Sequence, residues 1–149
     1  MGQIEVSSRL GKIIIDKSKI IYFPRGLIGF EGYHYFVLLQ IKDKSPFLLL
    51  QSTENSRLGL IVADPFVFVP HFRFSLNKIE EKVLRISGRD EISVLATVNI
   101  PAGKPENTTL NLSGPIVINN KSKRGLQLAV IEAGLPSHVV ISEFVQERT

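Results

Sequence analysis

The side chains best suited to acid–base or metal chemistry in this sequence are three histidines. His34, His71 and His138 each stand alone, without a carboxylate or second histidine at metal-ligand spacing. His34 and His71 also fall inside segments that read as strands, where a histidine is usually a surface or hydrogen-bonded residue. The chain has no cysteine, which excludes disulfides, thiolate zinc sites, iron–sulfur clusters and thiol nucleophiles. No metal centre is therefore predicted.

Motifs for nucleophilic or phosphate chemistry are also missing. The sequence contains neither the G-x-S-x-G nucleophile motif nor a P-loop. Gly26, Gly29 and Gly32 precede a predicted strand, whereas the dinucleotide-binding glycines open a helix, so turn geometry explains them. The carboxylates at 80–81 and 90–91 are sequence neighbours that point to different sides of an element. We therefore predict that the protein is not an enzyme and uses neither a cofactor nor a small-molecule substrate.

Length and composition bound the kind of protein. The chain has 149 residues, of which 44% are hydrophobic and 21% charged, as expected for one folded domain over residues 1–149. No apolar run approaches the roughly 18 residues that a membrane helix needs. The N-terminal residues alternate polar and apolar and lack a signal-peptide core. We therefore expect a cytoplasmic protein without a membrane partner.

The net charge is +4, with an isoelectric point near 9.5. The basic residues are scattered, and only 121–124 approaches a cluster, which is explained by a solvated turn. Nucleic-acid binders usually concentrate their charge on one stripe. No direct nucleic-acid partner is therefore expected.

Short β-branched and aromatic runs, bounded by Gly, Pro, Asp or Ser, predict mostly strands. The predicted strands cover residues 4–6, 13–15, 18–23, 33–41, 47–52, 59–63, 66–74, 94–100 and 126–130. In the 66–74 run, phenylalanines recur at period two, and Pro70 marks an edge or a bulge. One short helix is predicted near 77–86, with Asn77 and Glu80 as a capping box. Together these elements predict a mainly β, antiparallel barrel-like fold.

Several loops and strands resemble the motifs of one family. Residues 23–32 (FPRGLIGFEG) are similar to the F-P-x-G-L-x-G-F-E signature of the flagellar assembly factor FliW family. Further similar segments are 63–66 (ADPF) with 69–70 (VP), 98–101 (VNIP), 111–119 (NLSGPIVIN) and 125–130 (GLQLAV). The matches follow the family order from about Ile4 to Phe144, and that order makes them specific together.

The resemblance implies a non-catalytic regulator of bacterial flagellum biogenesis. Members of this family bind flagellin in the cytoplasm, and once flagellin is exported they bind the RNA-binding translational regulator CsrA. CsrA held in this way no longer represses translation of targets such as flagellin. The members associated with this antagonism are acidic, whereas this chain is basic. Negative charge near an RNA surface repels phosphate, so we expect Asp90, Glu91 and Glu106, which flank the predicted strand 94–100, to supply it.

Candidate partner-binding residues lie mainly in the loops. Leu27 and Phe30 are large apolar side chains in the 23–32 loop, and we expect Phe30 to be structural and Leu27 to lie closer to a partner. The further candidates, in loops that rim the predicted barrel, are Pro101, Lys104, Asn111 and Pro115. For Asn111, as for Asn119, capping of the backbone is the simpler explanation.

Two other functions stay open on the sequence. The basic isoelectric point and nine phenylalanines suggest a small β-barrel that binds RNA or single-stranded DNA. Against it, the phenylalanines of 66–74 follow core periodicity and are not interleaved with Lys and Arg. The other possibility is a hydrolase whose site has no recognised motif.

Overall fold

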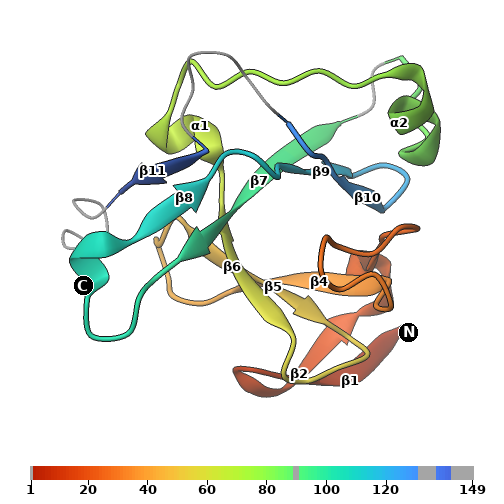
Figure 1. Cartoon of the computed structure of the whole chain (residues 1–149). Coiled ribbons are helices and arrows are strands. Elements are labelled where there is room, and N and C mark those ends of the chain that lie inside the picture. Colours follow the sequence, from red (N-terminus) through yellow and green to blue (C-terminus); the bar gives the residue numbers. More distant parts are fainter. Residues whose placement is uncertain (1, 89–90, 131–136, 142–149) are drawn as a thin grey trace.

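Strands dominate the structure, a computed structural model that describes residues 2–88, 91–130 and 137–141 (Figure 1). The strands are β1 (Gln3–Ser8), β2 (Gly11–Asp16), β3 (Ile21–Tyr22), β4 (Tyr35–Gln40), β5 (Phe47–Ser52), β6 (Gly59–Ala63), β7 (Ile92–Asn99), β8 (Thr109–Asn111), β9 (Ile116–Asn119), β10 (Arg124–Gln127) and β11 (His138–Val140). The helices are α1 (Pro65–Phe68) and α2 (Lys78–Val83), with the 3₁₀ turns η1 (Lys17–Lys19) and η2 (Pro105–Asn107). Each of these helices is too short to cross a membrane.

The main sheet of the described chain closes on itself. Its strand order runs from β7 through β6, β5, β4, β3 and β10 to β9, and β9 pairs again with β7. All of these pairs are antiparallel except β10 with β3, which is parallel at Arg124 and Tyr22. β8 and β11 branch from β7, with β11 at the outer edge. The predicted mainly β, barrel-like fold is confirmed, with one parallel pair in the expected antiparallel pattern.

The inside of the ring is filled by large apolar side chains. Phe23 and Phe36 meet edge-to-face, with ring centroids 5.4 Å apart, and both are fully buried. The other buried members of this cluster are Ile21, Leu27, Leu50, Leu58, Val62, Leu95, Ile116 and Ile118. Gly125 on β10 is a glycine for packing reasons, because a Cβ there would overlap the Phe23 ring.

Three separate segments cover the outside of the ring. The β1–β2 hairpin, at the bottom of Figure 1, packs on Val37 of β4. The end of α2, at the upper right, places Leu84 against Val117 and Leu126. The segment 69–74 packs Phe72 on strands β7 and β8. Most strands of the ring are therefore covered by apolar side chains on both faces, which explains their nearly continuous apolar runs.

The predicted strand over 66–74 is wrong. Asp64 accepts a hydrogen bond from the Phe66 amide at 2.9 Å, and Pro65 occupies the first helical position, so a helical turn starts here instead. Phe66 is 38% exposed whereas Phe72 is 3% exposed, so the phenylalanines do not share one face. His71 lies in the turn after α1, and His34 lies just before β4, so neither histidine is in a strand.

The predicted helix is present but shorter than 77–86. The capping box is confirmed: the Asn77 side chain accepts from the Glu80 amide at 2.8 Å, and the Glu80 carboxylate accepts from the Asn77 amide at 2.9 Å. The helix ends early because Arg85 adopts a positive φ of 55°. The predicted strand 18–23 is also shortened, since Asp16 caps the Ser18 amide and opens η1.

Candidate functional site

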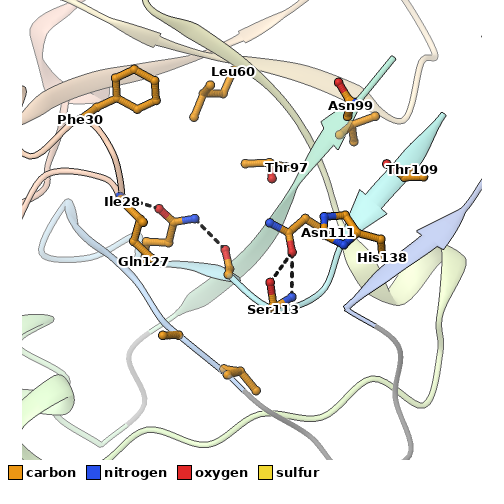
Figure 2. A pocket seen from close by; sticks show the side chains of 14 residues that line it. Ile28, Phe30, Leu60, Thr97, Asn99, Thr109, Asn111, Ser113, Gln127 and His138 are labelled. Carbon is orange, nitrogen blue, oxygen red and sulfur yellow. Dashed lines mark hydrogen bonds between the residues drawn. The ribbon is translucent and has the colours of Figure 1, made fainter. Parts of the chain in front are cut away.

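A groove of about 670 Å³ lies where the 23–32 loop meets β7, β8 and the end of β10 (Figure 2). Its lining residues are Ile28, Phe30, Leu60, Thr97, Val98, Asn99, Thr109, Asn111, Ser113, Gly114, Gln127, Ala129, Val130 and His138. Apart from His138, every one of these side chains is apolar or an uncharged amide or hydroxyl. The groove therefore suits an apolar partner surface with a few hydrogen-bonding groups.

The 23–32 loop forms one wall, and its backbone is tightly folded. Gly26 has a positive φ of 64°, and a Cβ there would come within 2.8 Å of the backbone of Phe30 and Glu31, so only glycine fits. The Phe30 amide donates to the Leu27 carbonyl at 2.8 Å. The Gly29 amide donates to the Glu31 carboxylate at 3.0 Å, and this bond lowers the pKa of Glu31. The turn role expected for Gly26 and Gly29 is confirmed.

The structure reverses the expected burial of Leu27 and Phe30. Leu27 is 1% exposed and belongs to the cluster inside the ring, because the loop turns its side chain inward. Phe30 is 38% exposed and lines the groove, with its neighbour Ile28 58% exposed. The exposed apolar side chains of this loop are therefore Phe30 and Ile28, and Leu27 holds the loop to the core.

Gln127 fastens two walls of the groove together. Its Oε1 accepts from the Ile28 amide at 2.8 Å, and its Nε2 donates to the Gly114 carbonyl at 3.0 Å, as the dashed lines in Figure 2 show. A Cβ on Gly114 would lie 2.9 Å from that Nε2, so a glycine there leaves room for the amide. The 23–32 loop and the 111–115 loop are thus held at a fixed separation.

The opposite wall carries Asn111 on β8, beside His138 on β11 (Figure 2). Asn111 Oδ1 accepts from both the amide and the hydroxyl of Ser113, at 2.9 and 2.7 Å, so the expected backbone capping is confirmed. Pro115 is buried and does not line the groove, and its carbonyl accepts from the Leu128 amide at 2.8 Å. Asn119 also caps, accepting from the Lys121 amide at 3.0 Å and donating to the Leu84 carbonyl at 2.9 Å.

The remaining candidates lie away from the groove. Pro101, Lys104 and Glu106 belong to the β7–β8 connection; Lys104 and Glu106 are exposed and Pro101 is half-buried. Glu91 is exposed just before β7, and Asp90 lies outside the described residues. Since an eight-residue strand is about 25 Å long, Glu91 and Glu106 stand at distant ends of β7 and form no compact acidic cluster.

Metal binding has no support in the described part of the chain. There, no three His, Asp or Glu side chains come close enough together to hold an ion. His34 Nδ1 lies 2.9 Å from the Phe23 carbonyl oxygen, and His138 Nδ1 lies 3.1 Å from the Ser137 hydroxyl.

Comparison with known proteins identifies the family. A family model described as FliW protein matches residues 5–139. The chain belongs to the FliW family. Flagellar assembly factor FliW of Nitratidesulfovibrio vulgaris (strain DP4) is 47% identical over 135 residues, covering 91% of this chain and 78% of the relative. The FliW of Thermosipho africanus (strain TCF52B) is 35% identical over 125 residues, covering 84% and 86%.

The fold is also that of a FliW. A crystal structure of the flagellar assembly factor FliW superposes with a TM-score of 0.81 and 29% sequence identity, covering 93% of this chain and 96% of that one. The similarity extends over nearly the whole chain, so the overall arrangement of strands described above is FliW-like.

Several groove residues of this FliW-family chain were not predicted. Gln127 and Ile28 are 99 positions apart, and no local pattern links them. One signal was available: Gln127 is the polar residue between two leucines in a strand, which places it on the face opposite to theirs. Leu60, Thr97 and His138 come together only through strand pairing, so their common place in the groove could not be predicted without the fold.

Proposed function

We propose that this protein is a cytoplasmic, non-catalytic flagellar assembly factor that binds flagellin in the groove beside Phe30. The observation that carries the proposal is the groove itself, which exposes Phe30 and Ile28 among uncharged side chains. The terminal helices of flagellin need a holder for their apolar faces before export, and an amphipathic helix docks its apolar face into such a groove. Membership of the FliW family supports a role in flagellar assembly.

The second half of the proposal is partner switching by a single domain over residues 1–149. When flagellin has left the cell, the free protein binds CsrA, and CsrA then no longer represses the translation of flagellin. The order of the family motifs along the chain supports this role. Catalysis is not required, because each partner only competes for the pool of free protein.

Gel filtration tests the flagellin half. Mixed with monomeric flagellin at micromolar concentrations, the protein is expected to co-elute with it as one complex. Burial of an apolar helix face in the groove should give a dissociation constant at or below this concentration. Two independent peaks would contradict the proposal. Lysozyme, a basic protein of similar size, controls for charge-driven association with flagellin.

Charge reversal tests how CsrA loses its RNA. Glu91 and Glu106 stand at opposite ends of β7, so a docked CsrA faces one of them more closely than the other. We therefore expect one of the two single variants, Glu91→Lys or Glu106→Lys, to displace less leader RNA from CsrA, and the other to behave like the native protein. Both variants should still bind CsrA. Glu5→Lys, on the β1–β2 hairpin, is the control. Unchanged RNA displacement in both variants would remove electrostatic repulsion from the mechanism.

A further inference from the structure

A row of stacked side chains crosses three neighbouring strands away from the groove. Arg124 of β10 pairs in register with Tyr22 of β3, and Tyr22 pairs with Tyr35 of β4. The Arg124 guanidinium carbon lies 5.2 Å from the Tyr22 ring centroid, and the two tyrosine rings stack with centroids 5.2 Å apart. His34 adds a fourth flat group, 6.3 Å from Tyr22. None of these residues lines the groove.

The row is held in place and exposed at one end, since Tyr35 is exposed while Tyr22, His34 and Arg124 are half-buried. Residues in register on adjacent strands share a face, and this row lies on the outside of the ring, between the β1–β2 hairpin on β4 and α2 beside β10. Arg124 Nε donates to the Val83 carbonyl at 2.7 Å, which orients the guanidinium plane. Tyr35 ends the row with 45% of its surface exposed, so its ring can receive another flat group.

Positive charge gathers at the Arg124 end of the row. Lys123 precedes Arg124, and its carbonyl accepts from the Tyr22 amide at 2.8 Å. Lys123 and Lys19 line a second cavity of about 510 Å³, together with the Asp16 carboxylate, which is engaged with the Ser18 amide. The hydrogen bonds from Ser18, and to a smaller extent the charge of Lys19, lower the pKa of Asp16, so Lys19 faces a carboxylate in this cavity. At the other end, the Glu54 carboxylate accepts from the His34 and Tyr35 amides, at 2.7 and 3.0 Å.

This arrangement of flat rings beside basic side chains matches one class of ligand. Single-stranded nucleic acids bind proteins by stacking bases on aromatic rings while Lys and Arg contact the phosphates. An acidic protein surface would use the lysines but leave the exposed Tyr35 ring without a partner. Unpaired bases are common in the loops and ends of RNA, where they stack on Tyr, His and Arg side chains.

We propose that the surface formed by Tyr35, Tyr22, Arg124, Lys123 and Lys19 binds single-stranded RNA. A base stacks on the outer face of Tyr35, and the strand continues across the row so that phosphates of its further nucleotides lie beside Arg124, Lys123 and Lys19. In the sequence, the phenylalanines of 66–74 are not interleaved with basic residues. Tyr22 and Tyr35 come to lie beside a basic residue, Arg124, only through strand pairing.

Fluorescence anisotropy with a labelled twelve-nucleotide oligouridine tests the surface. The native protein is expected to bind, and Tyr35→Ala is expected to lose at least fivefold in affinity, as removal of a stacking ring does. Tyr35→Phe should keep the affinity, because the ring remains. Lys123→Gln should make the dependence on salt shallower, by about one unit of slope. Phe66→Ala is the control for loss of an exposed aromatic ring elsewhere.

An abasic strand of the same length separates stacking from charge. It carries the same phosphates without bases, so the native protein should bind it at least fivefold more weakly than oligouridine. Equal binding of the two strands, an unchanged affinity of folded Tyr35→Ala, or no binding of oligouridine at 50 mM salt would each overturn the proposal. Phe30→Ala should bind RNA normally, which keeps this surface distinct from the flagellin groove.

Discussion

Replacing Leu27 with alanine is expected to lower the free energy of unfolding by about 2–5 kcal/mol, as truncation of a buried leucine does. Leu27 is 1% exposed and packs among the apolar side chains inside the ring, where the lost atoms leave a cavity. At about 2–4 °C per kcal/mol for a chain of this size, the melting temperature should fall by several degrees. Chemical and thermal unfolding of the purified variant measure both quantities.

The matched control is the next residue. Ile28 is 58% exposed, so Ile28→Ala should leave the melting temperature nearly unchanged. Equal melting shifts for the two variants would show that the loop does not bury Leu27. The folded fraction of Leu27→Ala should still bind flagellin, because this side chain does not line the groove.

Strands whose runs are bounded by strong turn signals were predictable to the residue. β5 and β6 match the predicted 47–52 and 59–63, because Pro46, the 53–58 turn and Asp64 bound them. The helix was predictable from its capping box, a local signal that depends only on residues three apart. The sequence predicted a barrel-like fold, but it did not predict that β7 and β9 are the strands that close the ring.

The failures have local and tertiary causes. Over 66–74, the period-two spacing of the phenylalanines favoured a strand, whereas Asp64 and Pro65 favoured the start of a helix. The chain forms the helical turn α1, which the hydrogen bond from the Phe66 amide to Asp64 caps. For Leu27 and Phe30, the pattern showed two apolar residues in a loop but not which one points inward. That choice depends on the positive φ of Gly26 and on the space beside Phe36 inside the ring.

Of the groove residues, sequence reasoning named Phe30 and Asn111 as candidates, but it expected Phe30 to be structural and did not find the contacts that shape the groove. The hydrogen bond between Gln127 and the Ile28 amide joins residues that are 99 positions apart in the sequence. The pairing of β10 with β3 brings these two segments together. The Arg124–Tyr22–Tyr35 row has the same origin, since its members meet through strand register.

Replacing Phe30 with alanine is expected to weaken flagellin binding at least tenfold, which corresponds to about 1.4 kcal/mol. Phe30 presents a large, partly exposed ring among the uncharged side chains of the groove, and aromatic residues are enriched among those that carry most of the binding energy of an interface. Stability should change less than for Leu27→Ala, because much of the Phe30 ring already contacts solvent.

Calorimetric titration of monomeric flagellin into the native protein, Phe30→Ala and Phe66→Ala compares two phenylalanines that are each 38% exposed. Phe66 is on α1, away from the groove lining, so Phe66→Ala should bind flagellin as the native protein does. We expect a micromolar or tighter complex for the native protein and Phe66→Ala, and a loss of at least tenfold for Phe30→Ala. Absence of a complex with the native protein, or equal affinities for Phe30→Ala and Phe66→Ala, would contradict flagellin binding in this groove.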